Sequence, residues 1–389
     1  MVYFNYKGCD YMNKLLQKYR EDLHQIPEIF FKEFKTKKYL KEALSEMGYN
    51  PMDILSTGLY VYIDNGNNST VAFRSDIDAL KVTEETGLPF KSTHEGYMHA
   101  CGHDGHMSML LGFAHYLKDK KDKLMKNVLL LFQPAEESIG GAKKIVETGI
   151  FKKLNVESIF GIHLFPDLEE GLIGSKANEF MAQANEVNIT VHGKSAHGAM
   201  PELGVDANII LSKILIEFEN IQTRMVSPLE YTIITFGKIE GGSVRNVLSD
   251  YARMEGTIRV FNPDTFIKIS EGIHNICKGY ELAYNCKVDV DIQDGYLPVV
   301  NDPVLYKVFR NAVSDFNYHE FEKPLMIAED FSFYQREVPG IFFFVGTKNE
   351  KLGYTNSLHN SMFNFTIDAL EVGLNSYITL SKKLGVINE

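Results

Sequence analysis

Short apolar runs that alternate with helical stretches occupy the first half of the chain and restrict the folds open to it. The runs have the length of strands and cover residues 58–64, 70–73, 128–132 and 158–162. Helical periodicity lies between them at 107–118 and 142–148. Alternating strands and helices are typical of a largely parallel sheet covered by helices on both faces. We therefore predict an α/β main domain with a mostly parallel sheet.

The middle of the chain has a different order of elements. Strands are expected at 187–191, 231–238, 251–260 and 287–292, and helices at 207–224 and 265–283. This β-α-β-β-α-β order is the ferredoxin-like pattern. The first pattern then resumes with a helix at 302–314, a strand at 341–345 and a helix from Ile367. A chain of 389 residues exceeds one ordinary core, so we predict a discontinuous main domain, 1–180 and 296–389, with an inserted α+β domain at 181–295.

The N-terminal region reads as amphipathic helix over 15–48, broken by Pro27 and capped by Gly48. Met12 opens the helical pattern, so residues 1–11 are expected to be an extension of little structural weight. Translation could begin at Met1 or at Met12.

Charge and cysteine content exclude several classes of protein. The net charge of −11 argues against nucleic acid or an anionic membrane as the main partner. The N-terminus lacks a signal-peptide pattern, and no apolar run approaches the length of a membrane span. Four cysteines are too few for a disulfide framework in a chain of this size. A cytoplasmic location is the simplest expectation.

Residues able to bind metal follow the expected strands of the main domain. Asp76 and Asp78 come after 70–73, Glu136 and Glu137 follow 128–132, and His163 ends 158–162. In open α/β sheets, ligands bind outside the carboxyl ends of the strands. We therefore expect these side chains to converge on one crevice.

The segment 98–106 is dense in metal-binding residue types. Three His, one Cys and one Asp lie within eight residues, and only Gly102 separates Cys101 from His103. From a loop, both side chains could point to one centre, and a thiolate with an imidazole suits zinc and similar metals. The alternative is a loop whose histidines cap a helix, but the density of ligands favours a metal site.

The pair Glu136-Glu137 lies between an expected strand and Gly140-Gly141. Adjacent carboxylates repel each other unless cations hold them. One could bind a metal while its neighbour takes the proton from metal-bound water. The alternative is a solvated helix N-terminus, which the position after a strand disfavours.

Other polar residues are ambiguous from chemistry alone. His359 would ordinarily be a surface residue, and His24 is expected to be structural rather than catalytic. In the inserted domain, His197 occupies a loop with Gly and Pro, where it could donate a hydrogen bond to an oxyanion. Asn246 or Arg259 could bind a substrate carboxylate, although Arg259 could instead form a structural ion pair.

Taken together, these motifs resemble the M20 metallopeptidase family. The similarity is to its amidohydrolase branch, which includes enzymes like aminoacylases, hippurate hydrolases and N-acetyldiaminopimelate deacetylases. It runs in order through 74–80, 99–106, 133–137, 161–163, 193–201, 255–259, 329–331 and 358–359. Eight short motifs in the right order over most of the chain make the resemblance specific.

The resemblance implies a zinc-peptidase-like catalytic domain and an inserted domain that serves for dimerisation and as a lid. It implies two divalent ions per chain, of zinc, manganese, cobalt or nickel, and it assigns their ligands as Cys101, His103, Glu137, His163 and His359. Glu136 matches the general base, and Asp78 matches a carboxylate that orients a ligand. His197 matches a histidine that reaches the partner subunit's active site, and Asn246 matches a contact to the substrate carboxylate. A homodimer is therefore expected.

The expected activity is metal-dependent hydrolysis of small N-acyl-L-amino acids, such as N-acetyl-diaminopimelate or N-benzoyl amino acids, by a metal-activated water. A dipeptidase and a non-catalytic metal-binding relative are the alternatives within the family. A cysteine-nucleophile hydrolase that uses Cys101 is an alternative outside it. Metal chelation would separate that last option, because it would spare a thiol enzyme.

Overall fold

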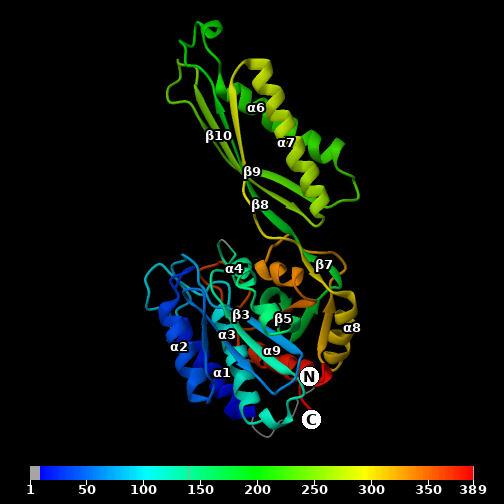
Figure 1. Cartoon of the computed structure of the whole chain (residues 1–389). Helices are drawn as coiled ribbons and strands as arrows, with labels where there is room; N and C mark the ends of the chain where they lie inside the picture. Colours follow the sequence, from blue (N-terminus) through cyan, green and yellow to red (C-terminus); the bar gives the residue numbers. More distant parts are fainter. Residues whose placement is uncertain (1–8, 139, 389) are drawn as a thin grey trace. The chain divides into compact units, whose positions relative to one another are not determined.

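The computed structural model describes residues 9–138 and 140–388, and it divides the chain into two compact units (Figure 1). The second unit consists of Met181–Val299 and Leu325–Glu329, and the first contains the rest of the described chain. A two-stranded sheet, β7 (Asn178–Met181) with β12 (Val299–Asn301), lies where the chain leaves the first unit and returns to it. The insert predicted at 181–295 falls within the second unit.

An eight-stranded sheet forms the centre of the first unit, in the order β1-β2-β4-β3-β5-β14-β6-β13. The strands are β1 (Met52–Ile54), β2 (Gly58–Ile63), β3 (Thr70–Asp76), β4 (Asn127–Gln133), β5 (Val156–Glu169), β6 (Leu172–Ser175), β13 (Asn317–Glu320) and β14 (Gly340–Lys348). The central strands β4, β3, β5 and β14 run parallel, and antiparallel pairs lie toward the edges. The predicted mostly parallel α/β sheet is confirmed.

Both faces of this sheet are covered, as the fully buried central strands require. One face packs on α1 (Cys9–His24), α2 (Phe34–Glu46), α3 (His103–Lys118), α8 (Pro303–Ala312) and α9 (Ile367–Lys383). The other face packs on α4 (Gly141–Glu147), α5 (Ile150–Lys153) and η4 (Asp330–Arg336). Side chains alternate accordingly: Phe73 contacts Phe113 and Tyr377 on the first face, whereas Phe342 contacts Phe331 on the second.

The break predicted at Pro27 is confirmed, because 15–48 falls into two helices separated by an irregular stretch that contains Pro27, and Gly48 has the predicted left-handed C-terminal conformation, with φ 83°. Two other sequence predictions differ from the structure in this unit. α1 begins at Cys9, three residues before Met12, and residues 1–8 lie outside the described part. His163 does not end its strand, because pairing with β14 continues β5 to Glu169.

The second unit is an antiparallel sheet covered on one face by two helices (Figure 1). Its elements are β8 (Gln183–His192), α6 (Ala207–Asn220), β9 (Thr232–Gly241), β10 (Tyr251–Val260), α7 (Pro263–Tyr284) and β11 (Lys287–Ile292). Their order along the chain is β-α-β-β-α-β, and the strand order is β11-β8-β10-β9. Alternate residues of β8 pack into the core with both helices, namely Val187, Ile189 and Val191. The strand order makes β9 and β11 the edge strands of the sheet.

Within the described residues, no helix is both long and apolar enough to cross a membrane.

Candidate metal centre

The polar residues that were expected to converge do lie together in the first unit. β3 carries Asp76 at its end and lies between β4 and β5 in the sheet. Glu136 and Glu137 follow β4, and His163 lies on β5 opposite Phe344 of β14. Because β3, β4 and β5 are parallel, the residues that follow β3 and β4 emerge at the same edge of the sheet, beside His163.

The five predicted metal ligands form one connected cluster, here called the ligand cluster (Cys101, His103, Glu137, His163 and His359). The sulfur of Cys101 lies 3.4 Å from His163 Nε2. Glu137 Oε1 lies 3.8 Å from His103 Nε2 and 3.3 Å from His359 Nε2. Their ligand atoms fall into overlapping groups of three. Within each group the atoms lie within 4.8 Å of one another, as the ligands of one metal ion must.

Two buried atoms of this cluster have no hydrogen-bond partner, which is unusual for buried polar groups. They are His103 Nε2 and Glu137 Oε1, and they face each other. Burial opposes ionisation of Glu137, but the nearby imidazole of His359, 3.3 Å from Oε1, and the charge of His103 lower its pKa to about 2. Burial lowers the pKa of His163, so its imidazole is neutral. A carboxylate and a neutral imidazole beside a thiol make a donor set that fits divalent metal ions.

Each ligand histidine on the buried side is oriented through its other ring nitrogen. His103 Nδ1 lies 2.9 Å from the carbonyl oxygen of Asp78, and His163 Nδ1 lies 2.6 Å from the carbonyl oxygen of Leu164. A ring N–H that donates to a carbonyl orients the ring so that Nε2 faces the cluster, and metal binding would displace the proton that charged His103 carries on that atom. Both Nε2 atoms point into the ligand cluster.

The carboxylate of Asp78 holds the turn that carries the acidic pair, here called the acidic turn (residues 134–137). Its Oδ1 accepts a hydrogen bond from the Glu136 N–H and its Oδ2 from the Glu137 N–H, each at 3.0 Å. Asp78 Oδ1 also lies 3.5 Å from His103 Nδ1. One buried carboxylate thus touches both the acidic turn and a predicted ligand.

His106, the last histidine of the ligand-rich segment, is not available to a metal. Its Nδ1 lies 2.6 Å from Asp76 Oδ1, and its Nε2 accepts the backbone N–H of Leu164 at 2.9 Å. The imidazole is therefore neutral, with its proton on Nδ1. α3 begins at His103, so the segment that was expected to be a loop ends in the first turn of a helix. From that turn, His103 points Nε2 toward Glu137, whereas His106 contacts Asp76 and the Leu164 N–H.

His359 is the most exposed member of the ligand cluster, with 55% of its side chain accessible. Its backbone is left-handed, with φ 64°, and its N–H donates to the carbonyl oxygen of Ala100 at 2.9 Å. Ser361 and Glu85 are joined by a backbone and a side-chain hydrogen bond. A histidine that would pass for a surface residue in the sequence is thus held beside Cys101 by local hydrogen bonds.

A family model supplies the decisive comparison. The model described as peptidase family M20/M25/M40 matches residues 72–383, about four-fifths of the chain. This chain belongs to that family. It is a hydrolase of the metallopeptidase type, as the resemblance predicted.

Curated and solved relatives agree with this assignment. The M20 hydrolase is 36% identical over 370 residues to an N-acetyldiaminopimelate deacetylase of Oceanobacillus iheyensis, covering 94% of this chain and 98% of the relative. It is 36% identical over 377 residues to a hydrolase of Staphylococcus haemolyticus, covering 96% and 98%. A crystal structure from Bacillus subtilis, described as a dinuclear metal-binding peptidase of the M20 family, has a TM-score of 0.83 at 29% identity, covering 97% and 99%.

A buried ionic cluster of the M20 hydrolase surrounds His24, which was expected to be structural. His24 Nδ1 lies 2.8 Å from Asp104 Oδ2, and His24 Nε2 lies 3.3 Å from Glu84 Oε1. Arg20 and His99 pack on the same group. Burial disfavours a charged imidazole, but the charge of Asp104 and the hydrogen bonds to Asp104 and Glu84 outweigh it and raise the pKa of His24 to about 9.

Stability should therefore depend on pH through His24. Its folded pKa lies above the unfolded value of about 6.5, so protonated His24 stabilises the fold fully below pH 6.5. That contribution is lost as the pH rises through about 9. We expect the Tm difference between the wild type and His24→Gln to be largest near about pH 6 and to shrink by about pH 9. Thermal melts across this range, with exposed His274→Gln as the control, provide the measurement; a constant difference contradicts the prediction.

The second unit brings two predicted substrate contacts into neighbouring loops. The N–H of Gly198 donates to the carbonyl oxygen of Asn246 at 2.8 Å, and Leu248 N–H donates to the Ala196 carbonyl at 2.9 Å. His197 is bridged to Val247 within the same pairing. Spacing in the sequence gave no sign of this pairing, because long stretches of α6 and β9 separate the loops.

Arg259, the third candidate in this unit, lies on β10 and is half-buried. Burial lowers the pKa of its guanidinium. Among the described acidic side chains, none lies within ion-pair distance of Arg259. The structural ion pair considered for Arg259 is therefore not formed within this part of the chain.

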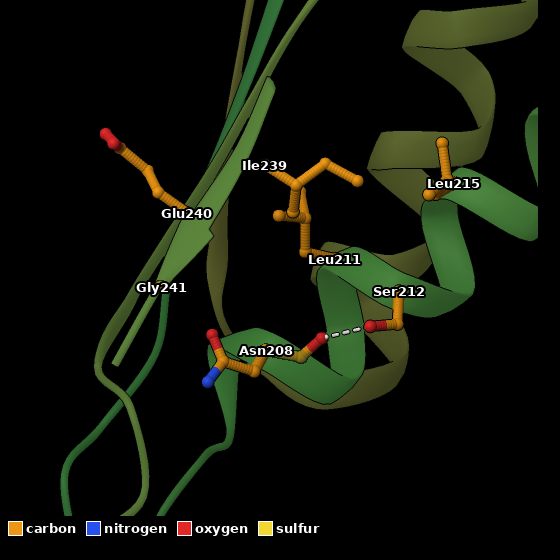
Figure 2. Close-up of a pocket in the computed structure, with 7 residues that line it drawn as sticks. All are labelled: Asn208, Leu211, Ser212, Leu215, Ile239, Glu240 and Gly241. Atoms are coloured by element: carbon orange, nitrogen blue, oxygen red, sulfur yellow. Dashed lines mark hydrogen bonds between the residues drawn. The ribbon is translucent and has the colours of Figure 1, made fainter. Parts of the chain in front are cut away.

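A surface hollow of about 280 Å³ lies between α6 and β9 (Figure 2). It is lined by Asn208, Leu211, Ser212, Leu215, Ile239, Glu240 and Gly241. Ser212 donates its hydroxyl hydrogen bond to the carbonyl of Asn208, within its own helix. The lining offers a single carboxylate and no imidazole or thiol, so it lacks the groups that hydrolysis needs.

Proposed function

We propose that this M20 hydrolase removes the acyl group from small N-acyl-L-amino acids by metal-assisted attack of water on the amide bond. One observation carries the proposal: Glu136 lies next to the predicted ligand Glu137 in a turn whose N–H groups are fixed by Asp78. Such a pair provides one carboxylate to bind metal and a second to move a proton. The relative named as a deacetylase supports amides of acylated amino acids as the substrate class.

In this proposal the ligand cluster holds two divalent ions, of zinc, manganese, cobalt or nickel. When bound, such ions lower the pKa of a coordinated water and polarise a carbonyl oxygen. The relative described as dinuclear supports the number of ions. The mixed sulfur, nitrogen and oxygen donors are compatible with each of these metals.

Glu136 is the proposed general base. Its carboxyl group lies in the same group of side chains as Glu137 and His103, within 4.8 Å by ligand atoms. There it would accept the proton of the attacking water and deliver it to the leaving amine. Asp78 would keep the side chain of Glu136 directed at the ligand cluster, because it accepts the hydrogen bond of the Glu136 backbone N–H.

Three residues of the second unit complete the proposal. His197 would donate a hydrogen bond to the oxyanion, a contribution worth about 3–4 kcal/mol in the transition state. Asn246 and Arg259 would bind the α-carboxylate of the substrate. The half-buried guanidinium of Arg259, which has no carboxylate partner among the described residues, supports that role.

We also propose that the second unit is a dimerisation and lid domain and that the protein is a cytoplasmic homodimer. β9 is an edge strand whose last residues are exposed. The neighbouring helix α6 exposes Ile209 (52%) and Ile216 (71%). An exposed edge with apolar neighbours is suited to pairing with a second copy, and light scattering would test it.

The test of the proposed function is an assay of amine release from N-acetyl, N-benzoyl and dipeptide substrates, with bound metal quantified. Chelator-sensitive release from N-acyl amino acids, with about two ions per chain, is expected. N-acetyl-diaminopimelate belongs in the panel because of the Oceanobacillus relative. Preference for dipeptides would indicate a dipeptidase, and bound metal without turnover of any substrate would contradict the proposal.

A further inference from the structure

Glu33 is a buried carboxyl group far from the ligand cluster in sequence but adjacent to the acidic turn in space. It precedes α2, and its residue has 0% exposure. Although Glu33 occupies the N-cap position of α2, its side chain makes no capping hydrogen bond to that helix. Its Oε1 instead accepts the backbone N–H of Ala135 at 3.0 Å. The side chain therefore serves the acidic turn rather than its own helix.

Three consecutive N–H groups of the acidic turn are bound by buried carboxylates. Glu33 receives that of Ala135, and Asp78 receives those of Glu136 and Glu137. The carbonyl oxygen of Ala135 accepts the N–H of Gly141 at 3.0 Å. These bonds fix the N–H groups of Ala135, Glu136 and Glu137 and the carbonyl oxygen of Ala135.

Ala135 needs this support because its backbone is left-handed, with φ 57°. A residue with a Cβ disfavours that conformation, so the surrounding structure must impose it. Gly141 allows the tight approach on the other side, since a Cβ there would lie 1.7 Å from the Pro134 carbonyl oxygen. Without an acceptor for its N–H, Ala135 would lose one of the two bonds that hold it in this conformation.

Glu33 is also costly to bury, which argues against a role as simple packing. Burial raises its pKa to about 7, and the charge of Asp78 adds to this effect. An apolar side chain of the same length would fill the space without that cost. What an apolar side chain could not supply is the acceptor for Ala135.

We propose that Glu33 is a positioning residue for hydrolysis, which holds the acidic turn through the Ala135 N–H so that Glu136 and Glu137 stay directed at the metal centre. The inference rests on the proposed function for its link to turnover. Its structural part, the fixing of the turn, can be measured without substrate.

Two variants of Glu33 separate the hydrogen bond from the charge. Glu33→Gln keeps an oxygen acceptor at the same length, whereas Glu33→Met keeps the length and removes the acceptor. We expect Glu33→Met to lower kcat by about 10-fold or more with KM nearly unchanged, the effect typical of lost support around a metal site. Glu33→Gln should stay within about threefold of the wild type, since its acceptor is retained. Equal kcat in all three proteins, or equal loss in both variants, would overturn the proposal.

Glu28→Ala is the matched control. Glu28 Oε2 also accepts backbone N–H groups, but those of Lys35 and Thr36 at the start of α2. Its loss should lower Tm without lowering the kcat of folded protein. If Glu28→Ala reduced kcat as much as Glu33→Met, Glu33 would be a structural residue of this region and the positioning role would be wrong.

Hydrogen–deuterium exchange of the peptide that covers residues 134–141 gives a readout independent of activity. We expect faster exchange in Glu33→Met and wild-type protection in Glu33→Gln and Glu28→Ala. Should Glu33→Met fail to fold, Glu33→Ser, which is too short to reach Ala135, takes its place. If the wild type hydrolyses no amide, the proposed function is wrong. Independently of that result, unchanged exchange of this peptide in Glu33→Met or Glu33→Ser would overturn the positioning role.

Discussion

Glu136→Gln is expected to lower kcat by about 10²–10⁴-fold while the protein keeps its fold and its metal. The amide side chain retains the size of Glu136 but cannot accept a proton from water. The backbone N–H of Glu136 still donates to Asp78, so the acidic turn should keep its shape. Steady-state kinetics together with metal analysis of the same sample provide the measurement.

Glu137→Gln is the matched control, because it changes the neighbouring residue in the same turn. Glu137 Oε1 lies within reach of His103 and His359, so this variant should lose metal as well as turnover. Near-normal kcat in Glu136→Gln would show that another group takes the proton. Loss of metal in Glu136→Gln would assign that residue to the ligands instead.

Removal of metal by a chelator is expected to abolish turnover and to lower Tm. The buried atoms His103 Nε2 and Glu137 Oε1, which have no hydrogen-bond partner, would remain without a cation. Any ion bound only by the folded state stabilises it, by about 2.7 kcal/mol when its concentration is 100 times Kd. Activity and thermal melts are measured before chelation, after it, and after addition of zinc, manganese, cobalt or nickel.

Metal removal also tests whether Cys101 acts as a thiol nucleophile. Burial, and then the charges of Glu137 and Glu136, raise the pKa of the Cys101 thiol well above its usual range. A protonated thiol is a poor nucleophile, so metal-free protein should be inactive. Recovery of activity on adding one of the four metals identifies a competent ion. Full activity in metal-free protein would overturn the metallohydrolase assignment.

Elements with strong periodicity were predicted from the sequence nearly to the residue. The expected strands at 251–260 and 287–292 coincide with β10 and β11, and the helix from Ile367 is α9. Short strands such as β6 and β13 were missed, because they gain their hydrogen bonds from neighbours distant in the chain. The extension of β5 beyond His163 was missed for the same reason, since β14 supplies its partner.

The candidate site followed from the sequence only in part. Dense local motifs made Cys101, His103 and the acidic pair candidates, whereas His359 depended on the family resemblance because nothing near it in the sequence suggests a ligand. The sequence did not show that His103 is available to a metal and His106 is not. That difference depends on helix geometry and on the Leu164 N–H, which occupies His106 Nε2. Glu33 gave no signal, since its partner is a backbone group 102 positions away.

The pairing of β5 with β14 has a consequence for synthesis of the chain on the ribosome. Ile159 pairs with Gly340, so the whole second unit is translated before β5 meets β14, its second parallel neighbour after β3. Until then a nascent first half presents β5 as an unprotected apolar edge, the kind of surface that promotes aggregation. His359 follows β14 in the chain, so a nascent chain acquires the full set of predicted ligands only after β14 has been made, and chaperone dependence should be greatest while β14 is still inside the exit tunnel.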